Sequence, residues 1–160
     1  MATICASTTD GALTMFGKIA VFLSGSHAVR TTMNGASVSF TAPNDLGSVG
    51  VGSSKVFQLQ INDINDNPMP QGTKVALANS VNITPLDVLP GVVPNIAPHS
   101  NAGDDKGGNT VSGPQGSFHT FAVAAPPLCP ESKQASFYVV VTTPGGTATT
   151  MPFKLQITCN

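Results

Sequence analysis

Charged side chains are scarce in this chain. Its 160 residues include only 7 Lys and Arg and 8 Asp and Glu, and the formal net charge is -1. An average soluble domain is roughly one quarter charged residues. A chain without a basic field has nothing to attract nucleic acid or an anionic membrane surface. Nucleic acid is therefore not an expected partner.

Aromatic residues and long apolar runs are also few. Trp is absent and there is a single Tyr, so we expect no aromatic platform on which bases or sugars could stack. No apolar run approaches the roughly 20 residues that a helix needs to span a bilayer. The amino-terminal "MATICASTTDG" lacks the basic start and apolar core of a signal peptide. These features fit a cytosolic protein or a piece of an exported one, and the three cysteines favour the exported piece.

Helical periodicity is missing as well, and strand-like alternation takes its place. Gly or Pro interrupts almost every window of twelve residues. In "KVFQLQIND", Phe57, Leu59 and Ile61 alternate with Gln, which predicts a half-buried strand. The same alternation predicts strands in 13–26, 36–43, 73–81 and 117–125.

Two further segments, 135–143 and 147–158, predict a closing hairpin around "PGG". If all three residues form the loop, Phe137 pairs with Phe153 and the apolar residues share one face. If only the two Gly form it, Phe137 faces Lys154. The first register keeps the apolar face intact, and three-residue loops that end in Gly are common. We therefore predict the Phe137–Phe153 register.

Seven or more short strands separated by turn residues are typical of one architecture. They predict an all-β fold, an immunoglobulin-like antiparallel β-sandwich, as a single module over 1–160. Residues 79–116 hold five Pro and six Gly and are expected to form one long irregular loop. Within it, "ITPLDVL" or "GVVPNI" is expected to add a short edge strand.

The segment "VFQLQINDINDNPMPQGTKVALA" resembles the strand–turn–strand signature of bacterial Ig-like domains, the tandem modules of invasin-like surface proteins. The residues that match a "D-x-N-x-N-P-x-P-x-G-T" turn are Asp63, Asn65, Asn67, Pro68, Pro70, Gly72 and Thr73. The closing hairpin is similar to that of such modules too. The resemblance implies a spacer or display unit of a large exported protein, outside the cell or on its surface.

The polar run "NDINDN" allows two interpretations. Asp63, Asn65, Asp66 and Asn67 supply oxygens of the kind that calcium prefers. However, no Gly occupies the sixth loop position of an EF-hand and no Glu the twelfth, and the match to a cadherin linker is imperfect. Asp and Asn also hydrogen-bond their own backbone in tight turns. We expect a polar turn and no cofactor, with a calcium loop as the alternative.

The three cysteines lack the paired spacing of a zinc site. The predicted hairpin register places Cys159 opposite residue 131, close to Cys129, so a Cys129–Cys159 disulfide is reasonable. A Cys5–Cys159 bridge is the rival, and three free thiols in a cytosolic protein are the remaining alternative.

Catalytic groups do not converge in the sequence. His27, His99 and His119 are dispersed, and none lies in a motif with an acid or a thiol. The chain is therefore not expected to be an enzyme, and His119, which alternates with core positions, is expected to be a strand residue and not a base.

Together these features predict a structural or adhesive Ig-like module of an exported bacterial surface or filament protein. Its partners would be neighbouring domains or copies of itself, with a host or surface ligand at the long loop as a further partner. The alternative is a self-assembling pilus, coat or phage subunit of the same fold, in which neighbours complete an exposed strand edge. Carbohydrate binding is a third hypothesis, which the shortage of aromatic residues disfavours.

Overall fold

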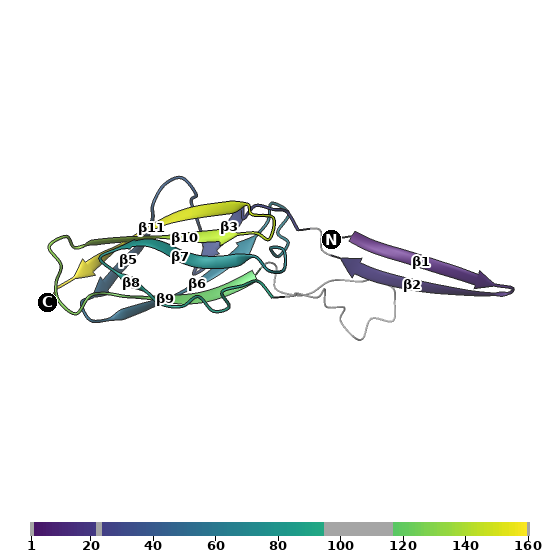
Figure 1. The fold of residues 1–160 in the computed structure, drawn as a ribbon, viewed down its shortest axis with the longest axis horizontal. Helices are drawn as coiled ribbons and strands as arrows, with labels where there is room; N and C mark the ends of the chain where they lie inside the picture. The colour runs from purple at the N-terminus through teal and green to yellow at the C-terminus, as the bar shows by residue number, and fades with distance from the viewer. Residues whose placement is uncertain (1, 22–23, 95–116, 160) are drawn as a thin grey trace.

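The computed structural model describes residues 2–21, 24–94 and 117–159, and the regular elements in these ranges are β-strands (Figure 1). None of the described segments is a helix long and apolar enough to cross a membrane. Residues 95–116 of the expected long loop lie outside the described ranges.

Two packed sheets form a β-sandwich. The four-stranded sheet has the order β5 (Asn44–Gly50), β11 (Ala148–Thr158), β10 (Gln134–Thr142), β7 (Lys74–Val81). The five-stranded sheet has the order β4 (Ala36–Ser37), β3 (Arg30–Met33), β6 (Ser54–Asn62), β9 (Ser117–Ala124), β8 (Thr84–Pro85). The core strands thus divide as in an immunoglobulin domain, and β5 adds a parallel pair with β11. The prediction of an all-β, Ig-like sandwich is confirmed.

Four phenylalanines join the two sheets through the core. Phe57 and Phe121 are register partners in one sheet, and Phe137 and Phe153 in the other. Successive ring centroids are 5.5, 5.8 and 5.5 Å apart, and the middle contact crosses between the sheets edge to face. Such pairs contribute about 0.5–1.5 kcal/mol each beyond the area they bury.

The closing hairpin adopts the predicted register. Phe137 lies opposite Phe153, and the N–H of Thr143 donates to the carbonyl of Thr147 at 2.9 Å. The loop therefore contains three residues, and its last one, Gly146, has φ 83°. Gly adopts this left-handed conformation readily, so it can end a three-residue loop. This loop length sets the register in which the apolar residues of both strands share one face.

The predicted strand over 36–43 is much shorter in the structure, since only Ala36–Ser37 pairs with β3. Asn44 explains the early end. Its side chain accepts from the N–H of Ser39 and donates to the carbonyls of Ser39 and Pro152. These bonds turn the chain out of one sheet and toward β11 of the other.

The edge strand expected within 79–116 is present as β8, which pairs with β9. The chain then crosses to the other sheet, where the N–H of Val75 donates to the carbonyl of Gly91 at 2.9 Å. The segment 84–93 therefore borders both sheets.

The strands β1 (Ala2–Asp10) and β2 (Leu13–Val21) lie outside the sandwich. They pair with each other as an antiparallel two-stranded sheet and extend from one pole of the sandwich (Figure 1). We call this hairpin the arm. The part of the predicted 13–26 strand that is described belongs to the arm and not to either core sheet.

Candidate functional site

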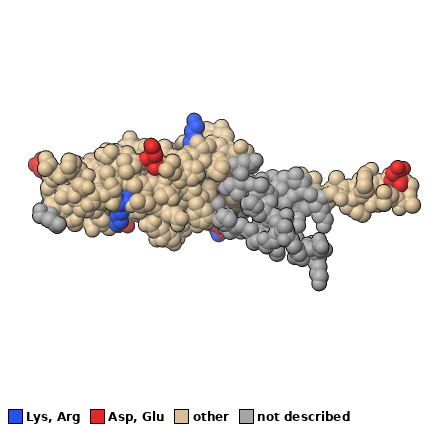
Figure 2. Space-filling model, turned by 90° about the horizontal axis from the view of Figure 1, so that it is seen from below, with Lys and Arg blue, Asp and Glu red and all other residues tan. Residues whose placement is uncertain are grey.

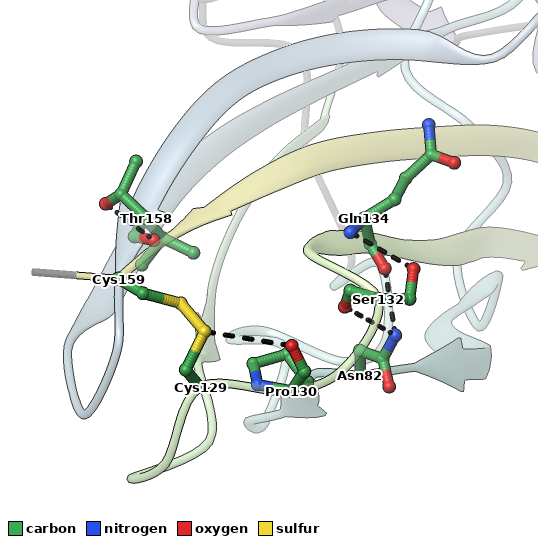
Figure 3. Close-up of a disulfide and its surroundings, with 8 residues drawn as sticks. Asn82, Cys129, Pro130, Ser132, Gln134, Thr158 and Cys159 are labelled. Atoms are coloured by element: carbon green, nitrogen blue, oxygen red, sulfur yellow. Dashed lines mark hydrogen bonds between the residues drawn. A yellow bond between two sulfur atoms is a disulfide. The ribbon is translucent and has the colours of Figure 1, made fainter.

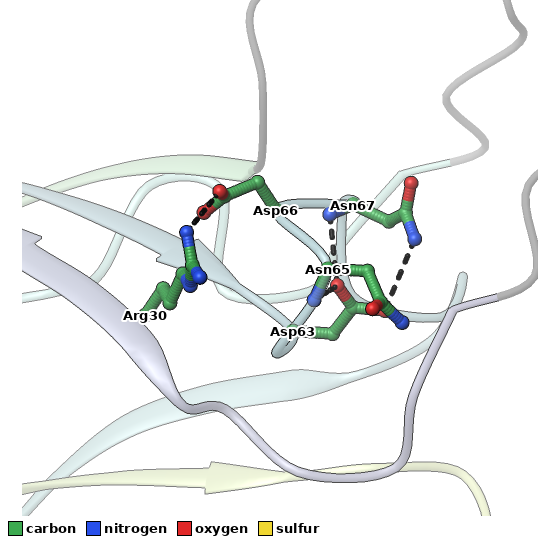
Figure 4. A network of polar contacts seen from close by, with 5 residues as sticks. All are labelled: Arg30, Asp63, Asn65, Asp66 and Asn67. Carbon is green, nitrogen blue, oxygen red and sulfur yellow. Dashed lines mark hydrogen bonds and ion pairs between the residues drawn. The ribbon is translucent and has the colours of Figure 1, made fainter.

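A buried carboxylate organises the turn between β6 and β7. Asp63 is 0% exposed. Its Oδ1 accepts from the N–H groups of Asn65 and Asn67, both at 2.8 Å. Its Oδ2 accepts from the N–H of Gly25 at 2.7 Å and from the side-chain amide of Asn67 at 3.3 Å. Figure 4 shows the bonds within the turn. The same side chain therefore closes the turn and holds the segment that follows the arm.

These hydrogen bonds determine the charge state of Asp63. Burial raises the pKa of its carboxyl, but the N–H groups of Gly25, Asn67 and Asn65 and the Asn67 amide together lower that pKa below its ordinary value of 3.8. The group is therefore a carboxylate at neutral pH.

The calcium interpretation requires oxygens that are directed at a common point. Both oxygens of Asp63 instead receive N–H donors. Asp66 is turned away from Asp63 toward Arg30, with which it forms an ion pair (Figure 4). Among the described residues there is also no group of three or more His, Cys, Asp or Glu that could hold a metal ion. This donor set does not fit calcium, and the geometry favours the polar turn.

A groove of about 580 Å³ lies beside this ion pair, on the outer side of β3 and β6. Arg30, Thr31, Asn62 and Asp66 are among its lining residues. The buried Thr31 Oγ1 and Asn62 Oδ1 have no hydrogen-bond partner within the described ranges. The groove thus combines an exposed ion pair with two lining residues whose polar side-chain oxygens are buried.

The opposite pole is held by a covalent bond. Cys129 and Cys159 form a disulfide with Cα atoms 5.7 Å apart, across a sequence separation of 30 residues (Figure 3). It joins the end of β11 to the loop that precedes β10. Cys5 is a free, exposed thiol on the arm.

His119 lies on the core face of β9 and is 1% exposed. Its Nδ1 is 2.5 Å from the carbonyl of Pro90, and its Nε2 is 3.2 Å from Ser117 Oγ. Burial lowers the pKa of the imidazole, while the contact with Pro90 raises it by less. A neutral ring that donates through Nδ1 fits this setting, so His119 fastens the segment before Gly91. His27 is exposed beside Ser26, and His99 lies outside the described residues.

The arm is the feature that our sequence analysis missed. A signal for it was present, because "DGA" separates two alternating segments, and Asp-Gly between such segments is a strong hairpin signal. Gly11 at the tip has φ +58°, a left-handed conformation that Gly adopts readily.

No family model matches the chain, and no curated protein matches it. The resemblance to invasin-type modules therefore stays a prediction.

Among solved structures, the chain is similar to domains 4 and 5 of the S-layer protein SbsC, with 14% identity and a TM-score of 0.42 over 97% of this chain and 58% of that one. It is also similar to a mutant of the SrpA adhesin from Streptococcus sanguinis, with 12% identity and a TM-score of 0.40 over 83% of this chain and 57% of that one. A third is a sialic acid binding region of a Streptococcus sanguinis adhesin, with 12% identity and a TM-score of 0.39 over 91% of this chain and 33% of that one. The chain thus spans less than two thirds of each of these structures. They are surface-layer and adhesin domains, and at these scores the likeness carries no argument about function.

Proposed function

We propose that this chain is a structural module of an exported protein, a rigid spacer or display unit of a cell surface or extracellular filament. The observation that carries the proposal is the Cys129–Cys159 disulfide at one pole of the sandwich. Disulfides form and persist in oxidising compartments and are rare in reducing ones.

The position of the disulfide suits a module under tension. The residues between the two cysteines include β10 and β11, which are central in their sheet. A pull transmitted through Cys159 passes through the sulfur–sulfur bond to Cys129. The two strands are bypassed and stay in the sheet as long as the bond is intact.

The orientation of the sandwich strands also suits a module whose role is to bear force. These strands run along the long axis of the molecule (Figure 1), so a pull along that axis acts on several ladder hydrogen bonds together. The proposal contains no catalytic step, since His119 is buried and engaged by Pro90 and Ser117.

A self-assembling subunit of a pilus, coat or phage particle is the second candidate. The arm favours it, because its described strands do not join either sheet of the sandwich. An isolated two-stranded hairpin is at best marginally stable in water, so a projecting arm gains order from a neighbour.

The test is the location and redox state of the protein in its source. Intact cells or particles are treated with a membrane-impermeant biotin reagent, quenched, lysed in the presence of a thiol-blocking agent and digested. Mass spectrometry should find biotin on the surface lysines Lys74 and Lys133, together with a linked Cys129–Cys159 peptide. A cytosolic protein of the same cells is the control for leakage. Unlabelled protein with both cysteines blocked as thiols would overturn the proposal.

A further inference from the structure

The arm has one markedly apolar face. Residues that are register partners in an antiparallel pair place their side chains on the same face, and alternate residues share it. Met15 is opposite Thr8 and Leu13 is opposite Asp10, so these residues share a face with Ile4. Ile4, Leu13 and Met15 are 56%, 65% and 60% exposed.

The opposite face of the arm is more polar, although it includes Phe16. It carries Cys5, Ser7, Thr9 and Thr14, and the hydroxyls of Thr9 and Thr14 are 3.1 Å apart. Figure 2 shows acidic atoms at the tip of the arm, and nearer its base Lys18 is the register partner of Cys5. The arm is therefore an amphipathic ribbon, and its apolar face has no counterpart among the described residues of its own chain.

A second unpartnered apolar surface lies on the outer side of the five-stranded sheet. Val56 is the register partner of Ala122, and the N–H of Leu86 donates to the carbonyl of Ala122, so these three form one row. Phe118 lies four residues further along β9. Val56 is 63% exposed, and Leu86 and Phe118 are exposed as well. We call this surface the apolar outer face.

The spacings of the two surfaces agree. On the arm, the rows of Ile4 and Met15 are four residues apart, because Met15 is opposite Thr8. On the apolar outer face, the rows of Val56 and Phe118 are also four residues apart, because Val56 is opposite Ala122. At about 3.4 Å per residue, both separations are about 14 Å.

The charges of the arm and of the apolar outer face are complementary for only one of the two directions in which the arm can lie along that face. Beyond Met15, the next row of the arm contains Asp10 and Leu13 at the tip. Beyond Phe118, which is opposite Gln60, the next row contains Asn62 and Arg30. The Arg30 side chain is 59% exposed and lines the groove of about 580 Å³ together with Asp66, with which it forms an ion pair, so Asp10 would share the guanidinium group with Asp66. With Ile4 over Val56, Asp10 therefore reaches Arg30, and Leu13 reaches the groove.

We propose that the arm of one copy docks on the apolar outer face of the next copy, with its tip in the groove beside Arg30. This inference rests on the proposed structural role and names its partner, a second copy of the chain. With the arm in this direction, the two copies have the same orientation, and the arm of one lies along the sandwich of the next. The contact is head to tail and leaves an arm and an acceptor face at the two ends, so it propagates as a filament.

The contact has the size of a weak, repeating interface. Nine residues of strand are about 30 Å long, and a two-stranded ribbon is about 10 Å wide, so one face covers on the order of 300 Å². Counting both partners, and adding the groove, the buried area is on the order of 700–1,000 Å², which belongs to low-affinity assembly contacts. Avidity along a filament or a crowded surface would strengthen it.

The first experiment is sedimentation velocity of the full chain with Cys5→Ser, from about 1 µM to about 1 mM. Cys5→Ser prevents disulfide exchange between arms. The sedimentation coefficient should rise with concentration. The double variant Ile4→Asp, Met15→Asp should weaken association by at least about tenfold. Phe16→Asp is the matched control on the other face of the arm and should change it by less than about twofold.

The acceptor is tested in the same way. Val56→Lys with Phe118→Lys should weaken association as strongly as the arm variant, and Phe118→Thr serves if that pair does not fold. Tyr138→Lys, on the outer side of the other sheet, is the matched control. Circular dichroism and thermal unfolding establish that each variant is folded.

Mixing separates this arrangement from all others. The arm variant keeps an intact acceptor and the acceptor variant keeps an intact arm, so the mixture should form one-to-one heterodimers and nothing larger. In a single chain, Asp10→Arg should weaken association and Arg30→Asp should restore it.

A wild-type chain that is monomeric at about 1 mM, an arm variant that associates normally, or a mixture that fails to associate would each overturn the inference. Any of these results leaves the spacer role standing, because the surface-labelling experiment decides that role separately.

Discussion

The two poles of the sandwich are closed by different chemistry. At one pole a covalent bond joins Cys129 to Cys159, while at the other the carboxylate of Asp63 collects four hydrogen bonds and holds Gly25 below the arm. The first closure depends on the redox state of the surroundings and not on pH. The second depends on pH and not on redox state. The difference predicts that the stability of one small sandwich responds to redox state and to pH independently.

Of the changes that test the two poles, removal of the Asp63 carboxylate should have the largest effect on the free energy of unfolding. Asp63→Ala removes the carboxylate that accepts from the part-buried N–H of Asn65 and the buried N–H of Asn67, and the loss of such a bond costs about 1–3 kcal/mol. We expect the free energy of unfolding in urea to fall by about 3–4 kcal/mol. Asp66→Asn is the matched control in the same turn. It removes an exposed ion pair and tolerates the positive φ of 61° at this position, so it should cost less than about 1 kcal/mol.

Reduction of the Cys129–Cys159 disulfide should lower the free energy of unfolding by nearly as much. With a sequence separation of 30, the chain-entropy model gives about 3–4 kcal/mol for the bridge. Urea unfolding with and without a reductant measures this difference, and Cys5→Ser should leave it unchanged. Because the poles lie at opposite ends, reduction should cost Asp63→Ala as much as it costs the wild type. A clear departure from additivity would show that the poles are coupled.

The smallest expected effect concerns pH. The folded-state pKa of His119 lies below its ordinary value of 6.5, so unfolded chains bind more protons than folded ones in the window below 6.5, and stability is lost as pH falls through it. The lowered pKa of Asp63 adds a further loss as pH falls below 3.8. Urea midpoints from pH 8 to pH 3 should therefore decline in two steps. In His119→Gln the upper step should vanish, and a step that persists would assign it to another group.

The strands and their register could be predicted from sequence where local alternation alone determines them. They could not where a strand ends because of a contact that is distant in the sequence. The β10–β11 register follows from alternation, because only one loop length keeps Phe137 with Phe153. The short β4 could not be predicted in this way, since Val38 and Phe40 alternate correctly and the strand ends because Asn44 bonds to the distant carbonyl of Pro152.

The arm shows the same limit more sharply. Leu13 and Met15 alternate as regularly as residues of the core, and periodicity indicates that one face is apolar without indicating what covers it. The role of Asp63 was half predictable. The turn follows from the local Asp and Asn residues, whereas its bond to Gly25, 38 residues away, is a product of the fold.

The place of β11 has a consequence for the order of folding. This strand lies between β5 and β10, and it pairs in parallel with β5, so that Phe153 meets Asn44. A ribosome or a secretion pore releases Phe153 more than a hundred residues after Asn44. Until then the four-stranded sheet lacks an inner member, and β5 has no neighbour in it. Such long-range pairing is slow, so this sheet acquires its last inner strand, and β5 its only neighbour there, when nearly the whole sandwich has emerged.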